Sequence, residues 1–247
     1  MLLTRRFPSL GLARALVVAA ALGSMLSVAA AQSPEPAPAK TPAPTGSTSV
    51  APIVPLTPPE PEVAVMVPLE QLMAPGPLPD IVQGSATAPG TIVEYASMTC
   101  THCAAFHETI WPDLKAKYVD SGRVKFILRE FPLDPLATAG FMLARCAGPD
   151  KRNALVDLLY AEQKSWAFVE KPIEALAAEV KQAGLSQADF EACLTNQDLL
   201  TKVNQTRARA SEIFNVDSTP TFFVNGREMK GELPIDDFDK ALAPLLK

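Results

Sequence analysis

The apolar and polar positions from residue 91 onward predict a chain in which strands alternate with helices. Residues 91–95 form a short, β-rich apolar run that is typical of a buried strand. Apolar side chains then recur at roughly helical spacing over residues 104–118. Gly122 interrupts this stripe, and residues 123–131 alternate like a second strand.

The second half of the chain is mostly helical. The pattern between residues 136 and 214 predicts helices that are separated by glycine, proline or asparagine. They span residues 139–147, 151–163, 173–184, 187–195 and 199–214. Residues 221–224 and 227–230 form a hairpin, because the Asn225-Gly226 pair between them favours a type I′ turn. A helix over residues 234–245 closes the chain.

Two cysteines, Cys100 and Cys103, lie where the first strand is followed by a helix. A helix N-terminus has unpaired N–H groups and the positive end of the helix dipole, so it favours a thiolate on the first sulfur. Two intervening residues allow the pair to close a small disulfide ring. The spacing therefore predicts a redox-active pair with Cys100 as the nucleophile.

Three other kinds of site compete with this interpretation. A structural zinc site needs two further ligands, and the candidates Cys146, Cys193 and His107 have no partner nearby in the sequence. A c-type haem site needs histidine directly after the second cysteine, where Ala104 stands. A purely structural disulfide is the third alternative, although a bridge within one helical turn suits that role poorly. We favour the redox pair.

The first 31 residues have the features of a secretory signal peptide. A positive start precedes an apolar stretch over residues 15–28, and Ala29-Ala30-Ala31 provides a small-residue cleavage site. An uncleaved N-terminal membrane anchor is the alternative, because the apolar stretch is borderline in length. Export places the protein in the periplasm, an oxidising compartment in which disulfides persist.

Residues 32–77 are expected to form a disordered tether rich in proline and alanine. This stretch holds 13 of the 24 prolines of the chain, and proline interrupts both helices and strand ladders. A dimerisation arm is the alternative, but no heptad pattern supports it. We therefore expect a monomer with a single folded domain over residues 78–247.

Charge restricts the partners of the mature protein. Removing the leader removes Arg5, Arg6 and Arg14 and no acidic residue, so the net charge changes from −5 to −8. A negative charge of this size argues against nucleic acid and against an anionic membrane surface as partners.

Three motifs together resemble the DsbA-like thiol:disulfide oxidoreductases, especially their alphaproteobacterial branch. They are the strand and CxxC over residues 92–103, Arg129-Glu-Phe-Pro-Leu-Asp-Pro-Leu136, and Ser218-Thr-Pro-Thr-Phe-Phe-Val-Asn-Gly226. The resemblance covers residues 78–247 and implies an α/β, thioredoxin-like fold with an all-helical subdomain inserted over about 136–214. DsbA itself has Pro-His between its cysteines, whereas this chain has Thr101-His102.

The resemblance also implies roles around the cysteines. Cys103 would be the buried resolving thiol. His102 would stabilise the Cys100 thiolate by donating to the sulfur or carrying charge nearby, unless it is only a solvated helix residue. His107, one turn later, is expected to be a surface or packing residue.

Two further positions are candidates for the site. Glu94 is an acid in an otherwise apolar strand, so it is either exposed at a sheet edge or buried with a function. If it is buried, its pKa would be raised and it could exchange the proton of Cys103. Thr219-Pro220 opens the last strand pair; in the thioredoxin fold this position carries a cis-proline beside the disulfide, which implies that it holds the substrate backbone.

The remaining cysteines, Cys146 and Cys193, fall on two predicted helices of the insertion. Buried free cysteines are common packing residues. In an oxidising compartment we favour a structural disulfide between them, and the related alphaproteobacterial proteins resemble this chain in having a second bridge.

The expected function is that of an exported dithiol oxidase that introduces disulfides into reduced secreted client proteins without a cofactor or metal. A DsbB-like, quinone-linked membrane oxidase would reoxidise it. Two alternatives remain: an isomerase or reductase that is kept reduced, and a non-enzymatic client-binding or chaperone module.

Overall fold

The structure of the protein is a computed structural model that describes residues 65–246. The predicted signal peptide and the predicted tether up to residue 64 lie outside the described residues. Among residues 65–246, none of the helices has both the length and the hydropathy needed to cross a lipid bilayer.

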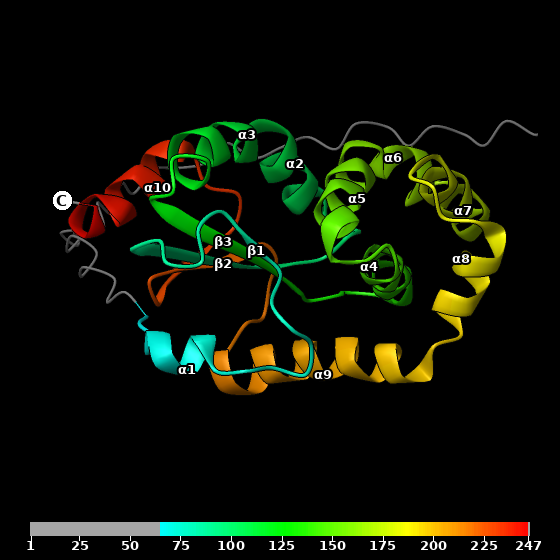
Figure 1. Ribbon diagram of the computed structural model, residues 1–247, viewed down its shortest axis with the longest axis horizontal. Helices are drawn as coiled ribbons and strands as arrows, with labels where there is room; N and C mark the ends of the chain where they lie inside the picture. Colours follow the sequence, from blue (N-terminus) through cyan, green and yellow to red (C-terminus); the bar gives the residue numbers. More distant parts are fainter. Residues whose placement is uncertain (1–64, 247) are drawn as a thin grey trace, which may run out of the picture. The chain divides into compact units, whose positions relative to one another are not determined.

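A five-stranded mixed sheet forms the centre of the domain (Figure 1). The strands lie in the order β1-β3-β2-β4-β5, with β2 and β3 parallel and the other pairs antiparallel. Their bounds are β1 Val82–Gln83, β2 Gly90–Ala96, β3 Val124–Glu130, β4 Thr221–Val224 and β5 Arg227–Lys230. Every position of β2 is buried, as expected for a central strand that is covered on both faces. The predicted strands and hairpin are therefore confirmed.

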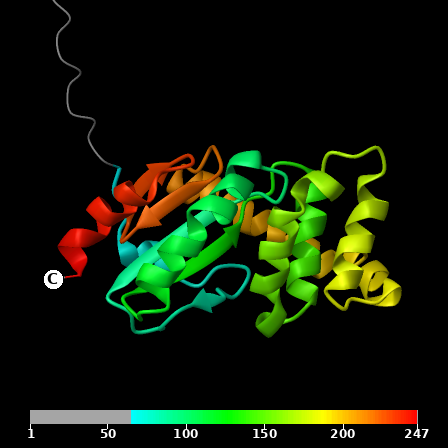
Figure 2. The same ribbon diagram turned by 90° about the horizontal axis from the view of Figure 1, so that it is seen from above.

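Residues 65–246 form ten α-helices. They are α1 Leu69–Met73, α2 Thr101–Thr109, α3 Trp111–Leu114, α4 Pro135–Cys146, α5 Pro149–Ala161, α6 Gln163–Trp166, α7 Pro172–Gln182, α8 Gln187–Leu194, α9 Gln197–Phe214 and α10 Ile235–Leu242. Helices α2, α3 and α10 cover one face of the sheet, α1 and α9 cover the other, and α4 to α8 form the inserted subdomain beside it (Figures 1 and 2).

Each face of the sheet has its own core, because side chains alternate along a strand. On β2, Ile92 belongs to the core under α2, whereas Val93 and Tyr95 belong to the core against α9. Glu94 lies two residues after Ile92, so its side chain points to the same face of the sheet. The carboxyl group of Glu94 is therefore directed toward the helix that carries Cys103.

The helix after the CxxC motif is shorter than the apolar stripe predicts. Helix α2 ends at Thr109, and a new helix, α3, starts at Trp111 with Pro112 in its first turn. Proline has no N–H for the helical ladder and its ring crowds the preceding turn, so the helix is interrupted there. A π-helical turn over Lys115–Val119 follows.

Most of the inserted helices start earlier than the pattern predicts, whereas α8 starts at Gln187 as predicted. Helix α4 begins at Pro135 rather than Ala139, because Asp134 caps it by accepting a hydrogen bond from the Ala137 N–H at 2.8 Å. Proline suits the first turn, where its missing N–H has no helical partner. Pro135 therefore starts the helix as well as following the strand.

The predicted boundary of the tether at residue 77 is wrong. Residues 65–77 pack on the domain: the Val67 N–H donates to the Gly226 carbonyl at 2.8 Å, Leu72 is fully buried, and Arg209 Nη1 donates to the Pro75 carbonyl at 2.8 Å. A Cβ on Gly226 would lie 2.1 Å from the Val67 carbonyl oxygen. Proline composition conceals this docking because proline carbonyls still accept hydrogen bonds and short apolar segments can still be buried.

Candidate active site

Cys100 occupies the N-cap of α2, at the junction that the sequence predicts. Its backbone is extended, its N–H donates to the Ser97 carbonyl at 3.1 Å, and its carbonyl accepts from the Ala104 N–H at 3.1 Å. The thiol lies 3.3 Å from the Thr219 carbonyl oxygen. Cys100 and Cys103 are both free thiols in this structure.

The two thiols of the motif have opposite acidities. A hydrogen bond from the Cys103 side chain lowers the pKa of Cys100 most, and burial opposes it. Backbone N–H groups of Cys103 and His102 add to the lowering, and the pKa of Cys100 is about 5. Burial raises the pKa of Cys103 well above its usual value, and the hydrogen bond with Cys100 and the charge of Glu94 add to this. One sulfur is therefore suited to be a thiolate and the other a protonated thiol.

The His102 side chain was expected to stabilise the Cys100 sulfur, but it follows the alternative prediction of a solvated helix residue. Its imidazole is largely exposed, and Nδ1 lies 3.2 Å from Oε2 of Glu232. What His102 offers to the Cys100 thiolate is its backbone N–H. The N-terminal turn of a helix points its N–H groups along the axis and its side chains away from it, which explains this placement.

Glu94 is fully buried on the central strand, not exposed at an edge. Its Oε2 lies 2.9 Å from Nε2 of His107, which is also buried, and the His107 ring stacks on Tyr160 with 4.4 Å between ring centroids. Burial alone would lower the pKa of His107, but the charge and hydrogen bond of Glu94, together with the nearby Asp157 carboxylate, raise it to about 9.

His107 is a buried packing residue, as one of the two sequence expectations has it, but it also pairs with Glu94, which the sequence analysis does not predict. His107 follows Cys103 by four residues, so both lie on one face of α2, and that face is the buried one. A histidine at this spacing, opposite an acid on the preceding strand, is the signal that could have identified the pair.

Gln163 is a further residue of the site that the sequence did not indicate. Its Nε2 donates to the Met98 carbonyl at 2.8 Å and the Cys100 carbonyl at 3.0 Å. Gln163 begins the short helix α6, which the periodicity does not predict. The inserted subdomain therefore braces the loop that carries the reactive cysteine.

The Thr219-Pro220 peptide bond is cis and lies beside Cys100, where the resemblance places it. The Thr219 hydroxyl oxygen is buried and has no hydrogen-bond partner among the described residues. Strand β4 begins directly afterwards and pairs with β2, which brings this loop to the same end of the sheet as the CxxC motif.

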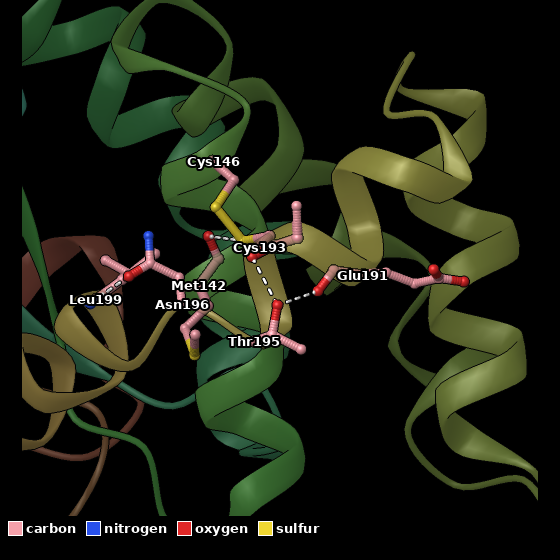
Figure 3. The surroundings of a disulfide bond; sticks show 8 residues. Met142, Cys146, Glu191, Cys193, Thr195, Asn196 and Leu199 are labelled. Atoms are coloured by element: carbon pink, nitrogen blue, oxygen red, sulfur yellow. Dashed lines mark hydrogen bonds between the residues drawn. A yellow bond between two sulfur atoms is a disulfide. The ribbon is translucent and has the colours of Figure 1, made fainter.

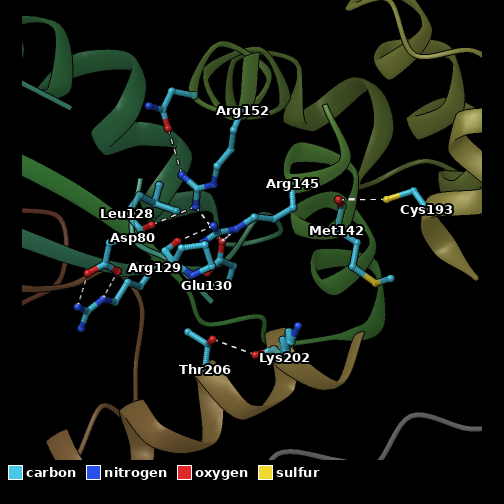
Figure 4. Close-up of polar contacts among 12 residues, drawn as sticks. Asp80, Leu128, Arg129, Glu130, Met142, Arg145, Arg152, Cys193, Lys202 and Thr206 are labelled. Carbon is cyan, nitrogen blue, oxygen red and sulfur yellow. Dashed lines mark hydrogen bonds and ion pairs between the residues drawn. The ribbon is translucent and has the colours of Figure 1, made fainter. Parts of the chain in front are cut away.

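A buried ion cluster connects the insertion to the sheet (Figure 4). Glu130 at the end of β3 accepts from Arg145 of α4 at 2.7 Å and from Arg152 of α5 at 2.8 Å. Burial raises the pKa of Glu130, but the charges of the two arginines outweigh it and hold it at about 2. A second pair, Asp80 with Arg129, lies nearby at 2.7 Å.

A disulfide joins Cys146 at the end of α4 to Cys193 on α8, with an S–S distance of 2.08 Å (Figure 3). The Cys193 sulfur lies 3.1 Å from the Met142 carbonyl oxygen. Both sulfurs are thereby occupied, so neither serves as a metal ligand together with the CxxC pair.

Comparison with known proteins agrees with this architecture. Residues 78–243 match a family model described as thioredoxin. A curated Rickettsia conorii protein, whose name assigns it provisionally to the protein-disulfide oxidoreductases, is 31% identical over 169 residues, which are 68% of this chain and 61% of that protein. The match thus spans about three fifths of the length of the first curated relatives.

Solved structures show the same fold. The crystal structure of Wolbachia pipientis alpha-DsbA1 aligns with a TM-score of 0.66 and 26% identity over 73% of this chain and 96% of that one. Chlamydia trachomatis DsbA, at 16% identity and a TM-score of 0.60, covers 68% of this chain and 94% of its own and supports the fold alone. The chain therefore belongs to the thioredoxin family, in the DsbA-like group whose fold carries a helical insertion.

Proposed function

We propose that this chain is an exported dithiol oxidase that donates a Cys100–Cys103 disulfide to secreted client proteins. The observation that carries the proposal is the difference between the two sulfurs: the pKa of Cys100 is about 5, whereas burial raises that of Cys103. A stabilised thiolate stabilises the reduced form, which makes the disulfide a strong oxidant.

The reaction proceeds through a mixed disulfide. A client thiolate attacks Sγ of Cys100 and breaks the Cys100–Cys103 bond, and Cys103 leaves with the electron pair and takes up a proton through Glu94. A second client thiolate then attacks the client sulfur of the mixed disulfide and displaces Cys100. The low pKa of Cys100 makes it a good leaving group in this step.

The loop at Thr219-Pro220 is the client-binding element of this proposal. It lies beside the nucleophile, and its backbone can pair with an extended client segment as an added strand. A quinone-linked membrane protein of the DsbB type would accept the electrons and restore the disulfide. The protein would act in the periplasm, where the predicted signal peptide directs it.

The redox state in the compartment tests the direction of the reaction. The full-length chain is produced in a Gram-negative host, and periplasmic protein is trapped with acid and alkylated. A mainly oxidised Cys100–Cys103 pair supports the oxidase. A mainly reduced pair would instead indicate an isomerase or reductase, and a pair that cannot be reduced would indicate a binding module.

Turnover provides the second test. The purified mature protein, with oxidised glutathione as terminal oxidant, should form disulfides in reduced ribonuclease, and the Cys100→Ser variant should not. Equal rates for the two proteins would refute the proposed chemistry.

A further inference from the structure

The buried thiol of Cys103 must exchange a proton in each redox cycle, and the exchange of disulfides does not by itself provide a route for that proton. Cys103 has no exposed surface, yet in each cycle its sulfur becomes a thiolate and must gain a proton, and later lose it. Bulk water does not reach this sulfur directly. A buried group beside it must hold the proton.

Glu94 has only one of its two oxygens engaged. Oε2 is bonded to His107, whereas Oε1 is buried and has no hydrogen-bond partner among the described residues. The charge of this carboxylate acts on Cys103, since it contributes to the raised pKa of that thiol. The free oxygen is thus available for a proton that moves to or from the sulfur.

His107 extends this arrangement away from Cys103. Its Nε2 contacts Glu94, whereas its Nδ1 is buried, unbonded, and 3.7 Å from Oδ1 of Asp157 on α5. The Asp157 side chain is half exposed, at 49%. Stacking on Tyr160 fixes the plane of the ring, so one nitrogen faces the buried acid and the other faces the partly exposed acid.

A cavity of about 340 Å³ opens on the outer side of His107, between α2, α3 and α5. Titratable or charged groups face His107, or share this cavity with it, from each neighbouring element: Glu94 of β2, Glu108 of α2, Lys115 of the π-helical turn, and Asp157 and Tyr160 of α5. Solvent in the cavity therefore reaches the acid that keeps His107 charged, without reaching Cys103.

We propose that His107 stores the proton of Cys103, passing it through Glu94, and that Asp157 at the cavity keeps His107 protonated between cycles. This inference rests on the proposed function, in which Cys103 is the resolving thiol. When the Cys100–Cys103 bond breaks, the Nε2 proton of His107 moves to Glu94, and Glu94 protonates the Cys103 thiolate. When Cys103 attacks again during reoxidation, the same proton returns to His107.

Single-turnover reduction of the oxidised mature protein by dithiothreitol tests this role, with rates divided by the thiolate fraction of the reagent. The His107→Gln variant keeps a hydrogen-bond donor toward Glu94 but cannot act as an acid, so its rate should fall by about ten-fold or more at pH 7. The wild-type rate should decline as the pH rises through about 9, and this decline should be absent in His107→Gln.

Two further variants make the test specific. Asp157→Asn should move the decline to lower pH, because one of the two acids that stabilise the His107 cation is lost. Glu108→Gln changes an exposed acid that lines the same cavity and should behave like the wild type. If Asp157→Asn and His107→Gln both keep the wild-type rate and pH profile, the inference is wrong.

Failure of this inference can be distinguished from failure of the proposed function. His107→Gln should retain the acidity of Cys100, since His107 does not contribute to the lowering of that pKa. Should His107→Gln fail to fold, His107→Ala with added imidazole provides the second measurement: imidazole in the vacated space should restore the rate, and no restoration would overturn the role. If the wild type does not oxidise reduced ribonuclease at all, it is the proposed function that fails.

Discussion

The two cysteine pairs of this domain can both form a disulfide, but they differ in the hydrogen-bond donors around their sulfurs. Cys100 and Cys103 lie three residues apart at a helix N-terminus, where N–H groups, a neighbouring thiol and the Thr219 loop converge on one sulfur. Cys146 and Cys193 are separated by 47 positions and join two helices of the insertion. No such set of donors surrounds them among the described residues.

The surroundings of a cysteine pair thus decide whether its disulfide is reactive or structural. Stabilising one thiolate makes the first pair easy to reduce. The second pair closes a long loop and therefore mainly restricts the unfolded chain.

The largest expected effect is on catalysis. Cys100→Ser should abolish oxidation of reduced ribonuclease, because no other described thiol combines partial access with a lowered pKa. The double variant Cys146→Ala/Cys193→Ala should keep most of the wild-type rate. Comparable losses in both proteins would mean that the bridge of the insertion takes part in the chemistry.

The next largest effect is on stability. Cys146→Ala/Cys193→Ala should lower the free energy of unfolding by about 4 kcal/mol, the chain-entropy value for a loop of this length. Urea denaturation of the oxidised proteins measures it. Cys100→Ser serves as the control, compared with wild-type protein whose Cys100–Cys103 pair alone is reduced, and should change the stability by only about 1 kcal/mol, in the usual range for a single substitution.

A pH-dependent effect should be confined to the reactive pair. The folded pKa of Cys100, about 5, lies below the unfolded value of 9.0, so the thiolate stabilises the reduced protein fully above about pH 9 and loses this effect as the pH falls through 5. The stability of the reduced protein relative to the oxidised one should therefore rise between pH 5 and 9. Thermal unfolding of both forms at several pH values checks this, and a flat difference would contradict it.

The smallest effect is expected from His102. Because its imidazole bonds to Glu232 and its backbone N–H is retained in any variant, His102→Ala should move the Cys100 titration less than Cys103→Ala does. Cys103→Ala removes the hydrogen bond that lowers the pKa of Cys100 most and should raise that pKa clearly above 5. Thiolate absorbance at 240 nm follows both titrations, and a larger shift in His102→Ala would restore the role that the sequence suggests.

Much of the fold could be predicted because its determinants are local. The apolar run before Cys100, the Asn225-Gly226 turn with positive φ at both residues, and the helix breaks at Gly148 and Gly184 all follow from conformational preferences of neighbouring residues. Errors arose where the decisive contact is distant in sequence. Residues 65–77 dock against β5 and α9, and no local pattern encodes those partners.

The features of the candidate site likewise separate into those set by local sequence and those set by contacts between distant residues. The position of the CxxC motif between a strand and a helix follows from the sequence alone, because spacing and periodicity are properties of the chain. Three contacts of the site depend on the folded chain: Glu94 bonds to His107, Gln163 braces the active-site loop, and the His102 imidazole bonds to Glu232. Burial and hydrogen-bond partners set the acidity of each group, and both depend on residues that only the folded chain brings together.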